Sequence, residues 1–249
     1  MLKFSTREKS ILTGLFFSKF DRDGLRAFGF TGFTEAFNII GLSLAVRPTS
    51  LKNYRDEFDP LFPNGRNGWH KRPMRDYCKK VYDDFGGLDL ADFTSLLKQA
   101  LYKEHDLDFL IEEVDAPNED KTGAFAKRLL TGQAAEQYFL DAHQSIPPFT
   151  GLEIEDTTKL GCGFDFKLSS SKISYAVEVK GLNDKHGSVT LTGKEHAVAS
   201  RMGERYFLFV VKNFKEKPLH DLYKNPLGGS LVFNKVEQEI IQINWTTRL

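Results

Sequence analysis

The chain has little cysteine, no long apolar run and no net charge, and each absence excludes a class of protein. Its 249 residues include two cysteines, Cys78 and Cys162, which are far apart and belong to no CxxC or Cys/His cluster. A disulfide framework or a zinc site is therefore not expected, and a reducing cytoplasm is the expected location. No run of about 18 apolar residues occurs, so a membrane span is not expected. The first residues also lack the layout of a signal peptide.

The charges cancel, with 34 basic and 34 acidic residues, but they are distributed unevenly along the chain. Residues 47–80 hold nine Lys/Arg and four acids, whereas residues 81–120 hold twelve acids and two bases. Residues 159–217 return to eleven bases and six acids. This partition would allow a basic binding surface on an otherwise acidic body. The alternative is that the charges are interleaved on solvated faces.

The chain is expected to divide at a polar, acidic linker over residues 113–123, which contains Pro117 and Gly123. Before it, apolar residues recur at three- and four-residue spacing, which predicts an all-helical domain over residues 1–112. The many phenylalanines near its start are expected to form a core. After the linker, residues 124–249 are expected to form a mixed α/β domain.

The second half shows an ordered series of element signals. A helix is predicted over residues 131–142, with Thr131 as its N-cap. Strand-like runs follow at about 152–156, 162–168 and 174–180, a capping box opens a helix at Thr192, and Gly203 closes it. A largely apolar run over residues 205–212 indicates a strand buried on both faces. The predicted order is therefore α-β-β-β-α-β.

Two carboxylates and a lysine are expected to converge in this half. Asp165 lies in the second strand-like run, and Glu178 and Lys180 lie two residues apart in the third, so they point to one face. A hairpin turn at residues 169–172 would bring Asp165 beside Glu178. Asp165, Glu178 and the carbonyl of Val179 would supply oxygen ligands of the kind that Mg²⁺ or Mn²⁺ prefers. Lys180 would orient a water and stabilise charge on a phosphate.

This pattern resembles the PD-(D/E)xK nuclease superfamily, and residues 130–212 resemble domains related to the C-terminal region of the NO VEIN protein. The resemblance is carried by Gly163-Phe164-Asp165, Val177 to Lys180, Thr192 to Glu195, and Arg205 to Leu208. Phe164-Asp165 stands where the superfamily usually has Pro-Asp, which leaves the carboxylate in place.

The resemblance implies a restriction-endonuclease-like core, an αβββαβ mixed sheet flanked by helices, preceded here by the all-helical domain. It also implies that Glu136 is an additional acid at the metal site. Thr192 and Lys194 would then lie near the cleft and contact the DNA backbone. A helix cap explains Thr192 equally well.

A loop rich in glycine and asparagine in the first half, residues 64–72, carries Arg66, Trp69, Lys71 and Arg72. Arginine and lysine reach phosphates or guanine edges, and an aromatic ring can pack against a sugar or a base. The loop is therefore a candidate DNA contact. The alternative is a turn in which Trp69 fills the helical core while the basic residues face water.

The sequence thus predicts a Mg²⁺-dependent endodeoxyribonuclease that acts on double-stranded DNA in restriction or anti-phage defence. Cleavage of both strands would suggest a homodimer. The alternative is a DNA-binding subunit that is inactive or is activated only by an ATPase partner, and a separate methyltransferase partner is also conceivable. RNA as the substrate stays open. The chain has no GxxxxGK[ST] motif, so any nucleotide-driven translocation would come from a separate polypeptide.

Overall fold

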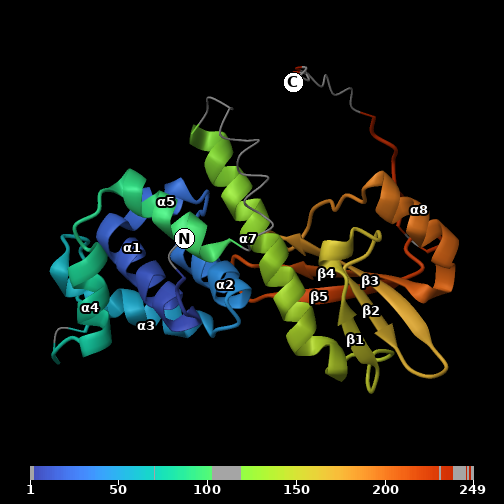
Figure 1. Ribbon diagram of the computed structural model, residues 1–249, viewed down its shortest axis with the longest axis horizontal. Coiled ribbons are helices and arrows are strands. Elements are labelled where there is room, and N and C mark those ends of the chain that lie inside the picture. Colours follow the sequence, from blue (N-terminus) through green and yellow to red (C-terminus); the bar gives the residue numbers. More distant parts are fainter. Residues whose placement is uncertain are drawn as a thin grey trace.

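The computed structural model describes residues 3–69, 71–102, 119–229 and 231–237, together with Trp245 and Thr247. Its first half is helical, as predicted (Figure 1). The helices here are α1 (Thr6–Ala27), α2 (Phe33–Ser43), α3 (Pro48–Phe58), α4 (Asp76–Phe85) and α5 (Leu90–Leu101). Among the described helices of the whole chain, none is both long and apolar enough to cross a membrane.

The phenylalanines near the start of the chain form a core, which confirms that prediction. Phe16, Phe17 and Phe28 are fully buried, and the Phe16 ring lies 5.5 Å from the Phe28 ring in an edge-on contact. Helix α1 begins with a capping box between Ser5 and Glu8. Burial of these aromatic side chains contributes to the stability of the helical half.

The second half contains a long helix, α7 (Glu119–Ala142), and a five-stranded sheet. The strands are β1 (Glu153–Asp156), β2 (Phe166–Ser169), β3 (Ser174–Leu182), β4 (Tyr206–Lys212) and β5 (Leu219–Lys224), and α8 (Gly193–Met202) connects β3 to β4. They are arranged in sequence order, with β3 and β4 parallel and the other pairs antiparallel. The predicted α-β-β-β-α-β order of a mixed sheet is confirmed, and β5 adds a strand that the sequence pattern did not predict.

Two elements differ from their predictions. The strand predicted over about 162–168 begins only at Phe166, so Asp165 lies just before β2 and not inside a strand. Helix α7 begins twelve residues before Thr131, and the Thr131 hydroxyl donates a hydrogen bond to the carbonyl of Lys127 at 2.7 Å. A threonine inside a helix bonds in this way to the preceding turn, whereas an N-cap accepts from the turn that follows. The assignment of Thr131 as an N-cap is therefore wrong.

Helices cover both faces of the sheet. Val177 and Val179 of β3 join the core that includes Phe139 of α7, whereas Ala176 packs with Val198 of α8 and its neighbours. Since successive residues of a strand point to opposite faces, Glu178 and Lys180 lie on the α8 side with Ala176. Tyr206 to Val211 of β4 are all buried, as expected for a central strand.

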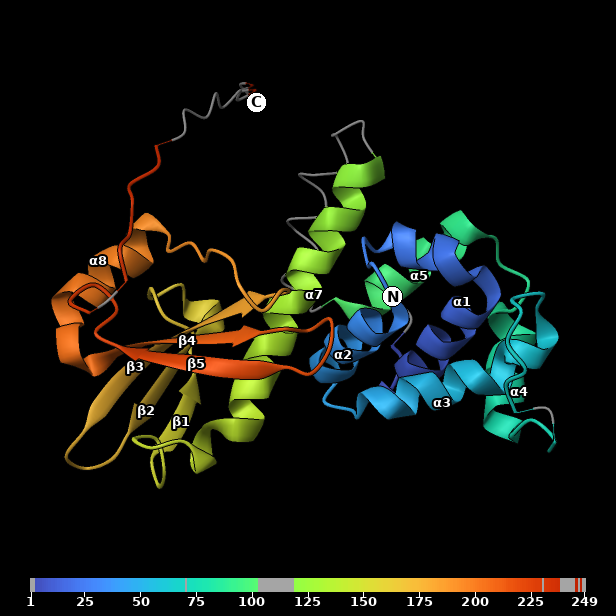
Figure 2. The same ribbon diagram turned by 180° about the vertical axis from the view of Figure 1, so that it is seen from behind.

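The helical half and the sheet are joined by direct contacts. The Asn38 side-chain amide donates to the carbonyls of Phe214 and Glu216, each at 2.8 Å, and Lys127 of α7 pairs with Glu35 of α2 at 2.6 Å. One hydrophobic core runs through both halves. Figure 2 shows α2 beside α7 and near the β4–β5 turn. Helix α7 begins inside the predicted linker, of which residues 113–118 lie outside the described residues, and the division into domains stays a prediction.

The close packing of α7 on β3 depends on Gly181. A Cβ there would lie 2.7 Å from the carbonyl oxygen of Thr131, which is backbone and cannot move aside cheaply. We expect Gly181→Ala to lower the free energy of unfolding by about 2 kcal/mol, the cost of overpacking a well-filled site. Urea unfolding measures this. Gly193→Ala is the matched control, because a Cβ there would meet nothing within 4 Å. Equal stability of the two variants would contradict the assignment.

Candidate active site

Asp165 is fixed against strand β3 immediately before β2 begins. Its backbone N–H donates to the carbonyl of Val177 at 3.0 Å, and its Oδ2 accepts from the backbone N–H of Val179 at 2.8 Å. Strands β2 and β3 form the antiparallel hairpin predicted from the sequence, closed by the Ser170 N–H bonding the Ile173 carbonyl at 2.8 Å. The Asp165 carboxylate is therefore held beside the stretch of β3 that carries Glu178.

Lys180 connects two carboxylates from different elements. Its Nζ lies 2.6 Å from Glu178 Oε1 and 2.9 Å from Glu195 Oε2. Glu178 is 3% exposed, so its charge is largely removed from water. The predicted placement of Glu178 and Lys180 on one face is confirmed.

Glu195 is a site residue that sequence reasoning recognised only as part of a helix cap. Its Oε2 accepts from the Thr192 backbone N–H at 2.8 Å, so one carboxylate both caps α8 and holds the Lys180 ammonium. The capping box was the available signal, because it anchors a glutamate at the end of α8 nearest to β3. Its pairing with a lysine fifteen residues earlier could not be predicted from spacing alone.

The electrostatics of the centre reflect like charges close together, with Glu178 buried and Asp165 half-buried. Burial raises the pKa of Asp165, and the neighbouring charges of Glu136 and Glu195 raise it further, while the Val179 N–H and Lys180 oppose the shift. Burial and the charge of Asp165 likewise raise the pKa of Glu178. Burial alone would lower the pKa of Lys180, but Glu178 and Glu195 outweigh it and the pKa is raised. Lys180 is therefore charged at neutral pH. Its positive charge stabilises the ionised forms of Asp165 and Glu178, whereas burial and their mutual repulsion destabilise them.

Tyr206 supports the loop that leads into Asp165. Its hydroxyl, buried in the smaller core beneath α8, donates to the carbonyl of Gly163 at 3.1 Å. Burial and the nearby carboxylates raise the pKa of Tyr206, so the hydroxyl stays protonated and keeps donating. The sequence had indicated only a strand residue at this position.

The remaining predicted residues of this half surround the same centre. Glu136 of α7 is half-buried, and its charge contributes to raising the pKa of Asp165; its role as the additional acid stays a prediction. Thr192 is the N-cap of α8, and its hydroxyl accepts from the Glu195 N–H at 3.2 Å. Lys194 is exposed in the first turn of α8. DNA contacts by Thr192 and Lys194 stay predictions.

The acidic side chains of the centre could act as ligands of a divalent cation only if enough of their oxygens converge. No group of three or more His, Cys, Asp or Glu side chains is placed to hold a metal within the described part of the chain. Asp165 and Glu178 nevertheless offer oxygen ligands, and among the described residues Asp165 Oδ1 accepts no hydrogen bond. Repulsion between carboxylates that are partly withdrawn from water is a condition that a bound cation relieves. The oxygens of Asp165, Glu178 and the Val179 carbonyl are of the chemical type that Mg²⁺ or Mn²⁺ prefers, and a metal held by them stays a prediction.

Comparison with known families agrees with the resemblance to the C-terminal region of the NO VEIN protein. Residues 135–224 match the family model described as Protein NO VEIN, C-terminal. This stretch, called here the NO VEIN-like segment, contains all five strands, α8 and every candidate residue of the second half. No curated protein and no solved structure matches the chain.

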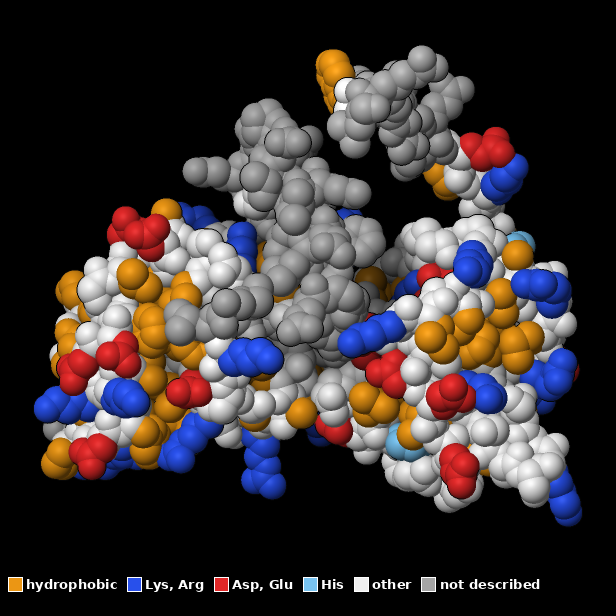
Figure 3. All heavy atoms as spheres, in the orientation of Figure 1, with side chains coloured by type: hydrophobic (Ala, Val, Ile, Leu, Met, Phe, Trp, Pro, Cys, Tyr) orange, Lys and Arg blue, Asp and Glu red, His pale blue; other side chains and the backbone are white. Residues whose placement is uncertain are grey.

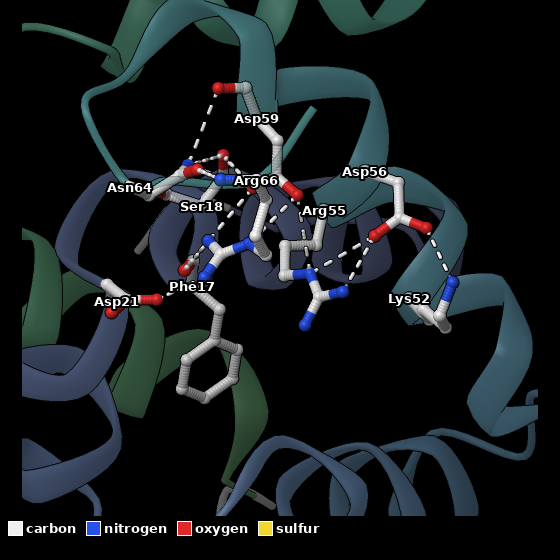
Figure 4. Close-up of polar contacts among 9 residues, drawn as sticks. All are labelled: Phe17, Ser18, Asp21, Lys52, Arg55, Asp56, Asp59, Asn64 and Arg66. Carbon is white, nitrogen blue, oxygen red and sulfur yellow. Dashed lines mark hydrogen bonds and ion pairs between the residues drawn. The ribbon is translucent and has the colours of Figure 1, made fainter. Parts of the chain in front are cut away.

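Arg66, predicted to contact DNA, lies outside the NO VEIN-like segment and is engaged internally (Figure 4). Its Nε and Nη2 each donate to a carboxylate oxygen of Asp59 at 2.9 Å, and its Nη1 donates to Asp21. Asp59 is 1% exposed and also accepts from the Ser18 hydroxyl at 2.8 Å. Asp21 interrupts the helical backbone of α1, with φ 47° and ψ −118°. These contacts give Arg66 a structural role, and a contact with DNA stays untested.

The other predicted loop residues lie around a cavity. Trp69 is half-buried and does not belong to the buried core. Together with Gly68, Lys71, Arg72 and Arg75 it lines a cavity of about 620 Å³. The sequence suggested that Trp69 either contacts DNA or fills the helical core, and the structure does not place it in that core.

Figure 3 shows how basic and acidic side chains are distributed over one face of the molecule. Lysine and arginine side chains are interspersed there with acidic ones over both halves. Interleaving, the alternative left open by the sequence, therefore describes this face.

A buried carboxylate beneath the cavity makes stability depend on pH. Burial alone would raise the pKa of Glu57, but hydrogen bonds from the side chain and backbone of Arg75 outweigh it and the pKa is lowered. A lowered pKa contributes stability above the unfolded value, about 4.3, and that contribution is lost as the pH falls through the folded value. We expect Glu57→Gln to cost about 2 kcal/mol of unfolding free energy at pH 7, and less at pH 3.

Urea unfolding at the two pH values measures this difference. Glu155→Gln is the control, since Glu155 is 57% exposed in its pair with Lys167 and should show little change at either pH. A penalty for Glu57→Gln that does not depend on pH would contradict the assignment.

Proposed function

We propose that the protein is a Mg²⁺-dependent endodeoxyribonuclease that hydrolyses DNA phosphodiester bonds, in restriction or anti-phage defence. One observation carries the proposal: half-buried Asp165, just before β2, is bonded to the backbone of β3 beside buried Glu178, and Lys180 is paired to Glu178 at 2.6 Å. The resemblance to PD-(D/E)xK nucleases argued from the sequence supports it. The match of residues 135–224 supports the likeness to the NO VEIN C-terminal family.

Each residue has a role that follows from its contacts. Asp165 and Glu178, with the Val179 carbonyl, would hold Mg²⁺, which when bound supplies positive charge to the phosphate and lowers the pKa of a coordinated water. The Lys180 ammonium would orient the attacking water and stabilise charge on the phosphate. Glu195 positions that ammonium, and Glu136 adds negative charge beside Asp165.

A second function is favoured by the way Lys180 is held. Its single ammonium contacts both Glu178 and Glu195, so part of the negative charge of the centre is already compensated within the protein. Lys180 pairs with Oε1 of Glu178, so a cation would bind this carboxylate through Oε2 or share it with the lysine. This partial compensation favours a DNA-binding subunit that is inactive alone or becomes active only with an ATPase partner.

One incubation series separates these functions. The purified chain is mixed with plasmid or phage DNA in buffer containing Mg²⁺, Mn²⁺, Ca²⁺ or EDTA, and the products are resolved on a gel. The nuclease predicts cleavage with Mg²⁺ or Mn²⁺ and none with EDTA. Binding of DNA without cleavage under every condition would favour the second function, and an RNA substrate in parallel tests the nature of the target.

A further inference from the structure

We propose that the cavity formed by Gly68, Trp69, Lys71, Arg72 and Arg75 binds one nucleotide unit, with its base against the indole ring and its phosphate against the basic side chains. Such a unit belongs either to a nucleic-acid strand or to a free nucleotide. The first source rests on the proposed nuclease function, in which this cavity would recognise part of the substrate. The second does not depend on it.

The size of the cavity suits a ligand of this kind. Its volume of about 620 Å³ lies within the range of about 300–1,000 Å³ that is usual for small-ligand sites. Its lining combines one large aromatic side chain with three basic ones and no acid. This combination matches a ligand that is flat and apolar at one end and anionic at the other.

The charges around the cavity leave an excess of positive potential. Lys71 is exposed and has no ion-pair partner among the described residues. Arg72 reaches Glu57 only at 3.4 Å and is 40% exposed, whereas Arg75 is closely paired with the same carboxylate. Two arginines thus share one buried acid and Lys71 pairs with none of the described acids, so Lys71 and Arg72 remain available to a phosphate.

The indole ring is already in a cationic environment. The guanidinium carbons of Arg72 and Arg75 lie 4.5 and 5.6 Å from the centroid of the Trp69 ring. Aromatic rings flanked by arginine are the platforms on which single nucleobases stack, because every base presents a π-face and its phosphate meets the nearby charge. A surface that held only phosphates would not need the aromatic side chain.

The part of the loop from Arg66 to Trp69 is held by several contacts, so little ordering of this part is needed for binding. The Trp69 N–H donates to the carbonyl of Asp56 at 2.8 Å, and a Cβ on Gly68, whose φ is +49°, would collide with that same carbonyl. Arg66 ties the start of the loop to buried Asp59. A preformed site retains more of its interaction energy as affinity.

The cavity is separate from the candidate active site. It lies in the loop between α3 and α4, whereas Asp165, Glu178 and Lys180 lie on the sheet on the other side of α7 (Figure 1). The site is therefore one of recognition or regulation, and its occupancy can be measured without any cleavage.

The test uses tryptophan fluorescence of the full chain in EDTA. The chain has two tryptophans, so Trp245→Phe leaves Trp69 as the only emitter. The probes are a single-stranded oligothymidylate of about ten nucleotides, a length within known single-strand site sizes, a blunt DNA duplex, and AMP. We expect a nucleotide probe to quench Trp69. Fluorescence polarisation of labelled oligonucleotide should show affinity about tenfold weaker or more for Trp69→Leu, and largely retained for Trp69→Phe.

The basic side chains are tested by salt titration. Lys71→Ala should reduce the slope of log affinity against log salt by about 0.7 for a single strand. Lys79→Ala removes the same charge from an exposed position outside the cavity and should leave the slope unchanged. Equal slopes for the two variants would overturn the assignment of the phosphate to this cavity.

The probes also identify the source of the nucleotide. Quenching by oligothymidylate shows that the bound nucleotide belongs to a nucleic-acid strand. Quenching by AMP that oligonucleotides do not reverse shows that the ligand is a free nucleotide. No quenching by any probe, or an unchanged affinity in Trp69→Leu, overturns the inference. Cleavage without nucleotide binding at the cavity would overturn this inference and leave the proposed nuclease function standing. Nucleotide binding without cleavage under any metal condition would refute the nuclease function and support this inference.

Discussion

Asp165→Ala and Glu178→Ala are each expected to abolish Mg²⁺-dependent DNA cleavage, because both carboxylates would be ligands of the same cation. Lys180→Met should leave metal binding in place and lower the cleavage rate about 10²–10³-fold, the usual loss when one charge-stabilising donor is removed. Ca²⁺ is expected to bind without supporting cleavage. Rates on plasmid DNA, together with calorimetric titration of Mn²⁺, separate loss of metal from loss of chemistry.

Glu153→Gln supplies the matched control for these variants. It removes an exposed carboxylate from β1 of the same sheet without touching the candidate centre, so cleavage should be unchanged. Circular dichroism of each variant distinguishes lost activity from lost structure. Undiminished cleavage by the Asp165 or Glu178 variant would refute the assignment of the active site.

Arg66→Ala is expected to destabilise the fold far more than Arg72→Ala, although both remove one arginine from the same loop. Asp59 is 1% exposed, and without Arg66 its carboxylate loses its two closest charged hydrogen bonds. Breaking a buried pair from one side costs about 3 kcal/mol or more. Arg72 is 40% exposed and should cost about 0.5 kcal/mol or less.

Urea unfolding of the two variants measures the difference. Adding Asp59→Asn to Arg66→Ala should recover part of the loss, because the neutral amide removes the uncompensated charge. Equal stability of the two single variants would show that the Asp59–Arg66 pair contributes little. A DNA-binding defect in Arg66→Ala alone is therefore weak evidence for a DNA contact, since the loop itself would be disturbed.

Local signals in the sequence were sufficient for much of the fold. The capping box at Thr192, the hairpin at residues 169–172 and the apolar run of β4 each depend on neighbouring residues, and the structure confirms them. Thr131 was wrongly predicted to be an N-cap, because a threonine that precedes a helical apolar pattern occurs both at caps and inside helices. Strand β5 was not predicted, since its residues are only partly buried and include His220 and Asp221.

The candidate site was predictable only in part, for a physical reason. Glu178 and Lys180 meet because a strand has a fixed period of two, which is visible in the sequence. The bond from Lys180 to Glu195 and the pair between Arg66 and Asp59 depend on how separate elements pack. No spacing rule encodes those distances, so Arg66 was predicted to face DNA although its guanidinium faces the protein interior.

The continuous core between the helices and the sheet has a geometric consequence for the reaction. Asn38 bonds the β4–β5 turn, and Lys127 pairs with Glu35, so the loop that carries Trp69 and the hairpin that carries Asp165 belong to one packed body. If a nucleotide is held at the first and a phosphodiester at the second, the span between them is set by the protein. The proposed cleavage would then occur at a constant number of nucleotides from the nucleotide bound beside Trp69.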